Sequence, residues 1–292
     1  MPDASRSLSD CSTQRLLFDW RRTPGLGVVV SIVLTFLYLP MAILSAYAFN
    51  ANRVVTVWSG FSLHWFWAVL QNEDLQRAAL NSIVVAVAAS MVATLAALGA
   101  ALALHIGVNR RVQALVTAII NLPLIVPEIV VSVTTLVLFA NLNMHHGLSN
   151  LIVGHTVFCI PYAFLPIRSQ LARLDRHLED VARDLYASEA NIYRFVVLPL
   201  LTPALFSGLV LAFVTSLDDF LISMMVARAG DTTLPVYVYG MMKIGITPEV
   251  NAISTLIVLV PTILFSCLII LFRGRLFAFP IDLNKLDNGD LS

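Results

Sequence analysis

The stretches LGVVVSIVLTFLYLPMAILSAYAF at residues 26–49 and AALNSIVVAVAASMVATLAALGAALAL at residues 78–104 contain no Asp, Glu, Lys or Arg. Each is longer than the roughly 20 residues that an α-helix needs to cross about 30 Å of hydrocarbon. The whole chain is 58% hydrophobic and only 12% charged, whereas a soluble domain is about 25% charged. A soluble enzyme with buried helices is disfavoured, because buried helices of this length with so little charge are rare. The sequence therefore predicts a membrane protein.

Apolar stretches of this kind predict six transmembrane helices, and the expected fold class is an all-α integral membrane protein. Nothing in the chain alternates with the period of two that a membrane β-strand requires. The predicted spans are residues 26–49, 80–104, 114–141, 150–170, 198–226 and 250–272. They form one domain over 26–272, between tails at 1–25 and 273–292. The first tail is polar and precedes an apolar stretch too long for a signal-peptide core, so we expect it to be retained.

The distribution of basic residues predicts the orientation of the spans. With the N-terminus in the cytoplasm, fourteen of the 18 Lys and Arg residues lie inside. The other four, Arg53, Arg77, Arg228 and Lys243, lie outside. This excess follows the positive-inside rule, so both tails are expected in the cytoplasm.

The segment 50–79, on the outer side, is rich in aromatic residues: Trp58, Phe61, Trp65, Phe66 and Trp67. An amphipathic aromatic segment is typical of chains that lie at the level of the lipid headgroups. Membrane anchoring is one interpretation, and contact with an external partner is the alternative.

Several chemistries have no support in the sequence. Cys11, Cys159 and Cys267 are scattered without metal-ligand spacing, and a net charge of zero gives no basic face for nucleic acid. The only lysines, Lys243 and Lys285, do not belong to a phosphate-binding loop. If the protein drives transport, we expect it to bind no nucleotide or other cofactor itself and to obtain energy from a partner.

The one long stretch rich in charge is LARLDRHLEDVARDLYASEANIYRFVVLPLLTP, residues 171–203. Its apolar residues recur at helical spacing opposite a charged face, which predicts a short amphipathic helix outside the membrane. Ser188 and Glu189 are typical of the start of a second helix, which runs to Pro199. The two helices form a cytoplasmic elbow that either rests on the lipid surface or binds a partner. The apolar face consists of Leu171, Leu174, Leu178, Val181, Ala182 and Leu185.

Acidic residues inside two spans are the candidate binding residues. Glu128, in LPLIVPEIVVSV, is expected near mid-bilayer, where a carboxylate costs about 2.5–3.5 kcal/mol on insertion scales. Pro123 and Pro127 are expected to kink this span. Asp218 and Asp219, in SLDDF, lie in the outer half of their span, and both face one path only if the helix breaks there. Acidic groups without buried bases favour a path for cations, and a structural hydrogen-bond network is the alternative.

The elbow resembles the EAA loop of ABC importer permeases, whose pattern is Glu-Ala-Ala, three residues, Gly, nine residues, Ile, any residue and Leu-Pro. In that family the loop is a coupling helix that docks on the ATPase, and the resemblance implies a type I ABC importer permease fold. Asp180 takes the place of the Glu, and Tyr186 takes the place of the Gly. A tyrosine is costly at positive φ, so we expect a helix break near Ala187 and Ser188 or an unusually rigid elbow. The implied coupling residues are Glu179, Asp180, Val181, Ala182, Tyr186, Leu198 and Pro199.

A second resemblance covers about residues 25–272 and involves SLDDF, TTLP and the pattern G-x-x-PE-x-NA. In this respect the chain is similar to the spermidine/putrescine branch of these permeases. The resemblance implies that Glu128, Asp218, Asp219 and Trp58, with Ser216 of the SLDDF stretch, serve polyamine passage. It also implies that the chain lies in the bacterial inner membrane. The implied partners are an ATPase dimer that holds ATP and Mg²⁺, a second permease subunit, expected to be a paralogue, and a periplasmic polyamine-binding protein.

Three alternatives remain at this point. The cargo of an ABC permease with this sequence could instead be an amino acid or a metal chelate. A proton-coupled secondary transporter could use the same carboxylates as a relay, although no internal repeat is detectable. A membrane enzyme is disfavoured, because the sequence contains no nucleophile motif and its histidines lack metal-ligand spacing.

Overall fold

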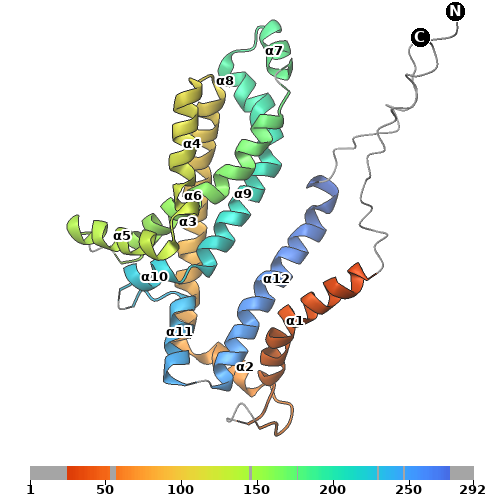
Figure 1. Cartoon of the computed structure of the whole chain (residues 1–292), viewed down its shortest axis with the longest axis vertical. Coiled ribbons are helices and arrows are strands. Elements are labelled where there is room, and N and C mark those ends of the chain that lie inside the picture. Colours follow the sequence, from red (N-terminus) through yellow and green to blue (C-terminus); the bar gives the residue numbers. More distant parts are fainter. Residues whose placement is uncertain are drawn as a thin grey trace, which may run out of the picture.

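The computed structural model describes residues 25–52, 57–144, 147–175, 177–228, 230–245 and 247–276, and these form helices joined by short connections (Figure 1). The one β-type pairing among them is an isolated bridge between Asn50 and Phe61. The all-α prediction is confirmed. The predicted tails lie almost entirely outside the described residues. The helices are α1 Leu26–Tyr47, α2 His64–Gln71, α3 Glu73–His105, α4 Arg110–Ile125, α5 Glu128–Asn141, α6 Gly147–Arg173, α7 His177–Asp184, α8 Glu189–Ile192, the π-helix η2 Tyr193–Val197, α9 Leu198–Asp218, α10 Leu221–Val226, α11 Leu234–Ile244 and α12 Pro248–Leu276.

Helices α3, α6 and α9 pack along one another and form the centre of the fold. The buried face of α3 is lined by small residues at helical spacing, including Ala86, Ala89, Ala93 and Ala97. Small side chains let helix backbones approach closely, which is how helices associate in lipid without a hydrophobic driving force. Larger apolar side chains of α6 and α9 complete the core at the elbow end of the bundle.

The contact between α6 and α9 has a fixed antiparallel register. A side chain at Gly208 would place its Cβ 2.9 Å from the carbonyl oxygen of Ala163. Four residues further along α9, the Cys159 thiol donates a hydrogen bond to the Ala212 carbonyl oxygen (3.4 Å). Four residues further again, His155 lies against Ser216. Because residues four apart share a helix face, these contacts form one continuous seam.

The six predicted spans correspond to α1, α3, the α4–α5 pair, α6, α9 with α10, and α12. Four helices in the described part of the chain are long and apolar enough to cross a membrane, and a fifth span results if α4 and α5 are one broken span. In α12 the apolar stretch found among the described residues is shorter, Pro248–Ile263. In place of the predicted kink, the third span has a sharp bend, because α4 and α5 meet at 104°. Pro123 and Pro127, at the end of α4 and just before α5, remove backbone donors at this bend.

The largest differences from the predicted bounds of the other spans are in α3 and in the fifth span. Helix α3 begins at Glu73 rather than at residue 80, because Asn72 caps it by accepting a hydrogen bond from the Leu75 amide (3.1 Å). The fifth span is not continuous to residue 226: α9 ends at Asp218, and α10 is a separate short helix. Helix α11 was not predicted, and its first turn is fixed by the Ser82 hydroxyl of α3, which accepts a hydrogen bond from the Leu234 amide (2.7 Å).

Helices α1, α2 and α12 form a second group beside the central bundle (Figure 1). Trp65 of α2 donates a hydrogen bond from Nε1 to the Asn50 carbonyl oxygen (2.8 Å), which fixes the chain between α1 and α2. The predicted aromatic segment thus contains one short helix with both a buried side, at Trp65, and an exposed side, at Trp67.

The Gly208–Ala163 contact gives a test of the seam. We expect Gly208→Ala to lower stability by about 1–3 kcal/mol, because the added methyl group collides with backbone rather than with a flexible side chain. Gly99→Ala is the matched control, since Gly99 is also inside a helix and has no atom of another element within 4 Å of a new Cβ. The measurement is thermal unfolding of the purified protein in detergent. Equal melting temperatures for the two variants would contradict the close contact.

Candidate functional sites: an acidic cluster and an exposed elbow

The three acidic residues predicted from the spans meet at two helix breaks. Glu128 is the first residue of α5, directly after the bend that follows α4. Asp218 is the last residue of α9, and Asp219 lies in the break before α10. The Glu128 carboxyl group is close enough to Asp219 and Asp218 for their charges to act on it. The sequence placed Glu128 and the aspartates at different depths, whereas the packing of α10 against α5 brings them into one cluster.

The two aspartates have different surroundings. Asp219 is buried, with 5% of its surface exposed, and its carboxylate caps α10. It accepts hydrogen bonds from the amides of Ile222 (3.4 Å) and Ser223 (3.0 Å) and from the Ser223 hydroxyl (3.3 Å). Asp218 is exposed. The helix break that the sequence required for both aspartates to reach one region is present, but only Asp218 offers a free carboxylate surface.

A histidine that the sequence analysis did not select completes the cluster. His155 of α6 lies 2.8 Å from the Ser216 hydroxyl through Nδ1, and through Nε2 it lies 3.1 Å from the Ser223 hydroxyl and 3.2 Å from Oδ2 of Asp219. Its side chain and that of Asp219 are each 1% exposed. The rarity of ionisable residues within membrane spans was the signal that could have selected His155. The expectation that no basic group lies near the carboxylates was wrong for Asp219.

The acidic cluster is suited to holding a cation rather than an anion. The side chains of Glu128, Asp218 and Asp219 are hydrogen-bond acceptors when ionised, and a cation can replace the hydration that a partly buried carboxylate loses. Among the described residues, no group of three or more His, Cys, Asp and Glu side chains is arranged to hold a metal ion.

Trp58, the remaining residue predicted for the path, lies apart from this cluster. It follows α1, packs edge to face on Tyr47 with ring centroids 6.4 Å apart, and is 54% exposed. In Figure 1 the connection between α1 and α2 is at the bottom of the molecule, away from α5 and α10. Within this chain, Trp58 and the carboxylates do not form a common site.

In the elbow an acidic residue is buried and several apolar residues are exposed, which is the reverse of a helix that packs only on its own protein. Glu179 of α7 is buried at 5% exposure, whereas the apolar residues Leu178, Val181 and Leu185 are exposed. Leu171, predicted for the same apolar face, instead belongs to α6 and is buried, because α6 continues to Arg173. Of the charged residues of α7 only Glu179 turns inward, whereas Asp180, Arg183 and Asp184 are exposed.

The inward partner of the elbow is the end of α3. Glu179 Oε1 lies 2.8 Å from Nε2 of His105, and both side chains are nearly inaccessible. Arg183 then joins the two elbow helices, since it contacts Asp180 at 3.0 Å and Glu189, at the start of α8, at 2.8 Å. The bond to Glu189 raises the pKa of Arg183 above its ordinary value, so the guanidinium stays charged. Of the two acids predicted for coupling, Glu179 is buried and Asp180 is exposed, and their coupling role stays a prediction.

The turn between the elbow helices lies where the glycine of the resembling pattern would place it. Tyr186 has a φ of +59°, in the left-handed region. The Ala187 amide bonds to the Ala182 carbonyl (3.0 Å) and the Tyr186 amide to the Arg183 carbonyl (2.9 Å), which is the Schellman pattern of helix ends. Helix α7 ends at Asp184 and α8 begins at Glu189, so Ala187 and Ser188 lie within the break, but the positive φ stays at Tyr186 instead of moving to these residues. Ser188 occupies the N-cap position of α8 without a side-chain capping bond.

The elbow ends at the start of α9. Leu198 is half-buried and Pro199 exposed, and the proline occupies the first turn of α9, where its missing N–H costs no helical hydrogen bond. Between α8 and α9 the backbone forms the π-helix η2, a widened turn. The elbow is thus continuous with the span that carries Asp218.

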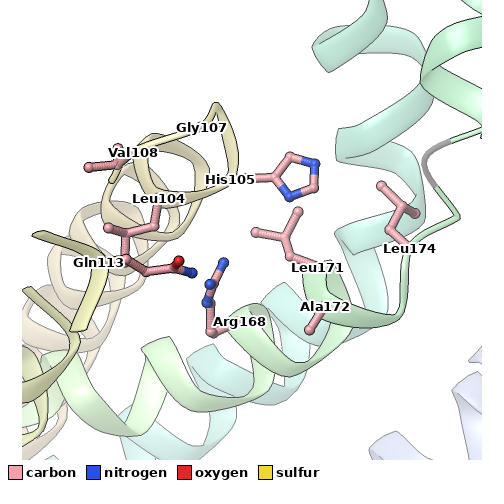
Figure 2. Close-up of a pocket in the computed structure, with 9 residues that line it drawn as sticks. All are labelled: Leu104, His105, Gly107, Val108, Gln113, Arg168, Leu171, Ala172 and Leu174. Atoms are coloured by element: carbon pink, nitrogen blue, oxygen red, sulfur yellow. The ribbon is translucent and has the colours of Figure 1, made fainter. Parts of the chain in front are cut away.

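A cavity of about 310 Å³ lies beside the base of the elbow, between the ends of α3 and α6 and the start of α4 (Figure 2). The ends of the Gln113 and Arg168 side chains point toward one another there, and His105 lies at the other side of Leu171. The sequence analysis predicted nothing at this position. The cavity leaves open space next to the His105–Glu179 contact.

The apolar helices, the acidic cluster at their breaks and the exposed elbow before α9 together define a permease, the membrane-spanning subunit of an importer, rather than an enzyme. Residues 93–277 match the family described as binding-protein-dependent transport system inner membrane component, and the chain belongs to that family. It is a multi-pass membrane protein that works with a separate ATPase and other subunits.

Two relatives are similar over most of the chain. The putrescine transport system permease protein PotI of Escherichia coli K12 is 34% identical over 242 residues, which cover 81% of this chain and 86% of the relative. The spermidine/putrescine transport system permease protein PotC of Haemophilus influenzae is 36% identical over 227 residues, which cover 78% and 88%.

Solved structures show the same fold. A chain of a bacterial ABC transporter involved in the import of the acidic polysaccharide alginate superimposes with a TM-score of 0.62 at 16% identity, covering 83% of this chain and 93% of that one. A chain of the MetNI methionine ABC transporter gives a TM-score of 0.57 at 21% identity, covering 70% and 95%. The fold is that of type I ABC importer permeases, as the EAA-like loop predicted.

The left-handed turn at Tyr186 gives a test of the elbow. Tyr186 is 97% exposed, so its ring makes few contacts within the chain, while its backbone conformation costs about 1–2 kcal/mol relative to glycine. We expect Tyr186→Gly to slow hydrogen exchange of the amides at 186 and 187 in the isolated permease. Tyr186→Ala is the control, because it removes the ring but keeps the strain. Equal exchange in the Gly and Ala variants would show that the turn stores no strain.

Proposed function

We propose that this chain forms part of the path of a polyamine importer, with the carboxylate cluster of Glu128, Asp218 and Asp219 as its cation-binding element. The observation that supports the proposal most directly is the meeting of three acidic side chains at two helix breaks. The names of the relatives, which are putrescine and spermidine permeases, agree with this chemistry.

Desolvation explains why an acidic cluster suits a polyamine. Each ammonium group that leaves water loses several kcal/mol of hydration unless charged or polar protein groups replace it. Helix breaks also free backbone carbonyls, which add oxygen ligands for a cation. A cluster of carboxylates at one position holds neighbouring ammonium groups together, and the exposed Asp218 is the first that an entering cargo meets.

We assign the elbow to the cytoplasmic side, where it docks on the ATPase. This orientation agrees with the fourteen basic residues on the elbow side and places both termini in the cytoplasm. The docking face consists of Leu178, Val181 and Leu185 with the exposed Asp180 beside them. An apolar face left open on a charged helix outside the membrane is typical of a protein contact, and lipid contact is the alternative.

The remaining partners follow from the same proposal. ATP and Mg²⁺ are held by an ATPase dimer, and a periplasmic binding protein delivers the polyamine to the side opposite the elbow. A second permease subunit, which we expect to be a paralogue, covers exposed apolar side chains of α4 and α5, such as Ile125 and Leu138. Trp58 contributes to the path from the outer side, where the exposed indole is available to incoming cargo.

The docking face can be tested at Val181, which is 57% exposed. We expect Val181→Asp to reduce binding of the ATPase to the permease by at least about tenfold, since a charge in the apolar contact is desolvated without a partner. Ser188→Asp is the matched control: it adds the same charge to the same elbow at an exposed position outside the apolar face. Co-purification and light scattering of the complex give the affinity. Unchanged binding by the Val181 variant would leave the elbow as a lipid-contacting segment.

The path can be tested with neutral variants of equal size. We expect Glu128→Gln and Asp218→Asn each to cut ATP-driven polyamine uptake into proteoliposomes, because the ammonium groups lose a charged partner. The separate binding protein should bind its polyamine unchanged in both cases. Asn141→Asp, on the opposite end of α5 and exposed, is a control for charge changes elsewhere on the helix. Wild-type uptake in both neutral variants would make the carboxylates structural and remove them from the proposed path.

A further inference from the structure

His155 is a buried titratable side chain to which the proposed path assigns no cargo contact. It extends from α6 across the break between α9 and α10 and touches both sides of it, Ser216 in the last turn of α9 and Ser223 in the first turn of α10. The seam between α6 and α9 fixes the position of His155 along the two helices, because the contacts at Gly208 and Cys159 set the register two turns and one turn away. A side chain at Gly154, its neighbour, would place its Cβ 3.1 Å from Cγ2 of Ile222 on α10 and 3.4 Å from Cγ2 of Thr135 on α5.

The hydrogen-bond roles of His155 follow from its partners. An ionised carboxylate only accepts hydrogen bonds, so the proton that faces Asp219 belongs to Nε2. In the neutral ring Nδ1 then accepts from the Ser216 hydroxyl, and in the charged ring it donates to the Ser216 oxygen. Both forms hold the same geometry. Asp219 consequently has four donors in this structure: two backbone amides, the Ser223 hydroxyl and the His155 ring.

A carboxylate with four donors and 5% exposure is a poor ligand for a passing ammonium group, since binding would require the loss of hydrogen bonds already made. Asp218, one residue earlier, is exposed at the last position of α9. Adjacent residues of an intact helix point about 100° apart, and the break with Asp219 in an extended conformation (ψ 122°) separates their directions.

We propose that His155 is a positioning residue of the path: by holding Asp219 and Ser216 across the α9–α10 break, it keeps Asp219 inside the protein and leaves Asp218 as the aspartate that meets the cargo. The statement about cargo rests on the proposed polyamine function. The statement about which aspartate is accessible does not.

Accessibility can be measured without any cargo. In a background in which Cys11 and Cys267 are serine, the buried Cys159 remains as an internal unreactive reference. Single variants Asp218→Cys and Asp219→Cys are treated, in the assembled complex, with a thiol reagent that carries an ethylammonium group, and the modified fraction is followed by mass spectrometry. We expect position 218 to react about tenfold or more faster than position 219, and His155→Leu to reduce that ratio toward one.

Uptake kinetics supply the second measurement. His155→Leu, similar in size but without a donor, is expected to raise the KM of the complex for putrescine presented by its binding protein about tenfold, with a smaller effect on the maximal rate. His155→Gln keeps an N–H near the position of Nε2 and should restore most of the affinity. A merely structural histidine would instead lower the amount of assembled complex in both variants without a KM change.

The outcomes separate the two levels of inference. Equal labelling of positions 218 and 219 with His155 present, or a labelling ratio that does not change in His155→Leu, would overturn the positioning role. Absence of putrescine uptake by the unchanged complex would overturn the proposed function, and the labelling ratio would still decide the role of His155. Failure of His155→Gln to restore the KM would also overturn the role as a donor.

Discussion

Gly208 of α9 lies so close to the backbone of Ala163 on α6 that a side chain at position 208 would collide with a carbonyl oxygen. This contact fixes the antiparallel register of the two helices, and the Cys159–Ala212 and His155–Ser216 contacts follow at intervals of one turn. In lipid the close approach of small residues is the main source of helix association. The placement of His155 against the end of α9 and Asp219 therefore depends on this seam, because the seam determines which residue of α6 faces the end of α9.

The acidic cluster combines two uses of a carboxylate. Asp219 supplies a structural capping group: in a region without water, the amides at the start of α10 need an acceptor, and the carboxylate with His155 beside it provides one. Asp218 and Glu128 are less enclosed and have no such set of donors among the described contacts. A break in a transmembrane helix thus costs little here, because a side chain satisfies the freed backbone, and it leaves charge available for a cation.

The elbow shows the same division between internal and external contacts. Glu179 and Arg183 tie α7 to the end of α3 and to the start of α8, so the elbow is joined to the central bundle by charged hydrogen bonds as well as by the chain itself. Leu178, Val181 and Leu185 take no part in these contacts and remain exposed. The elbow is therefore connected to α3 through the contact between Glu179 and His105, and to α9 through η2.

The sequence alone determined the membrane character, the helical class, the presence of an elbow and the identity of the acidic residues, because these depend on composition, on the length of apolar stretches and on helical period. Local chemistry was also sufficient to show that Pro123 and Pro127 disturb their span and that both aspartates need a helix break to reach one region. The tertiary structure decided the rest. It determined that α4 and α5 meet at 104° and that Glu128 lies near the aspartates. It also determined that His155 contacts Asp219. In the elbow, it determined that Glu179 turns inward and that Tyr186 adopts a left-handed turn. The physical reason is that each of these outcomes depends on a partner far away in the chain, and no local period or propensity records which helix faces which.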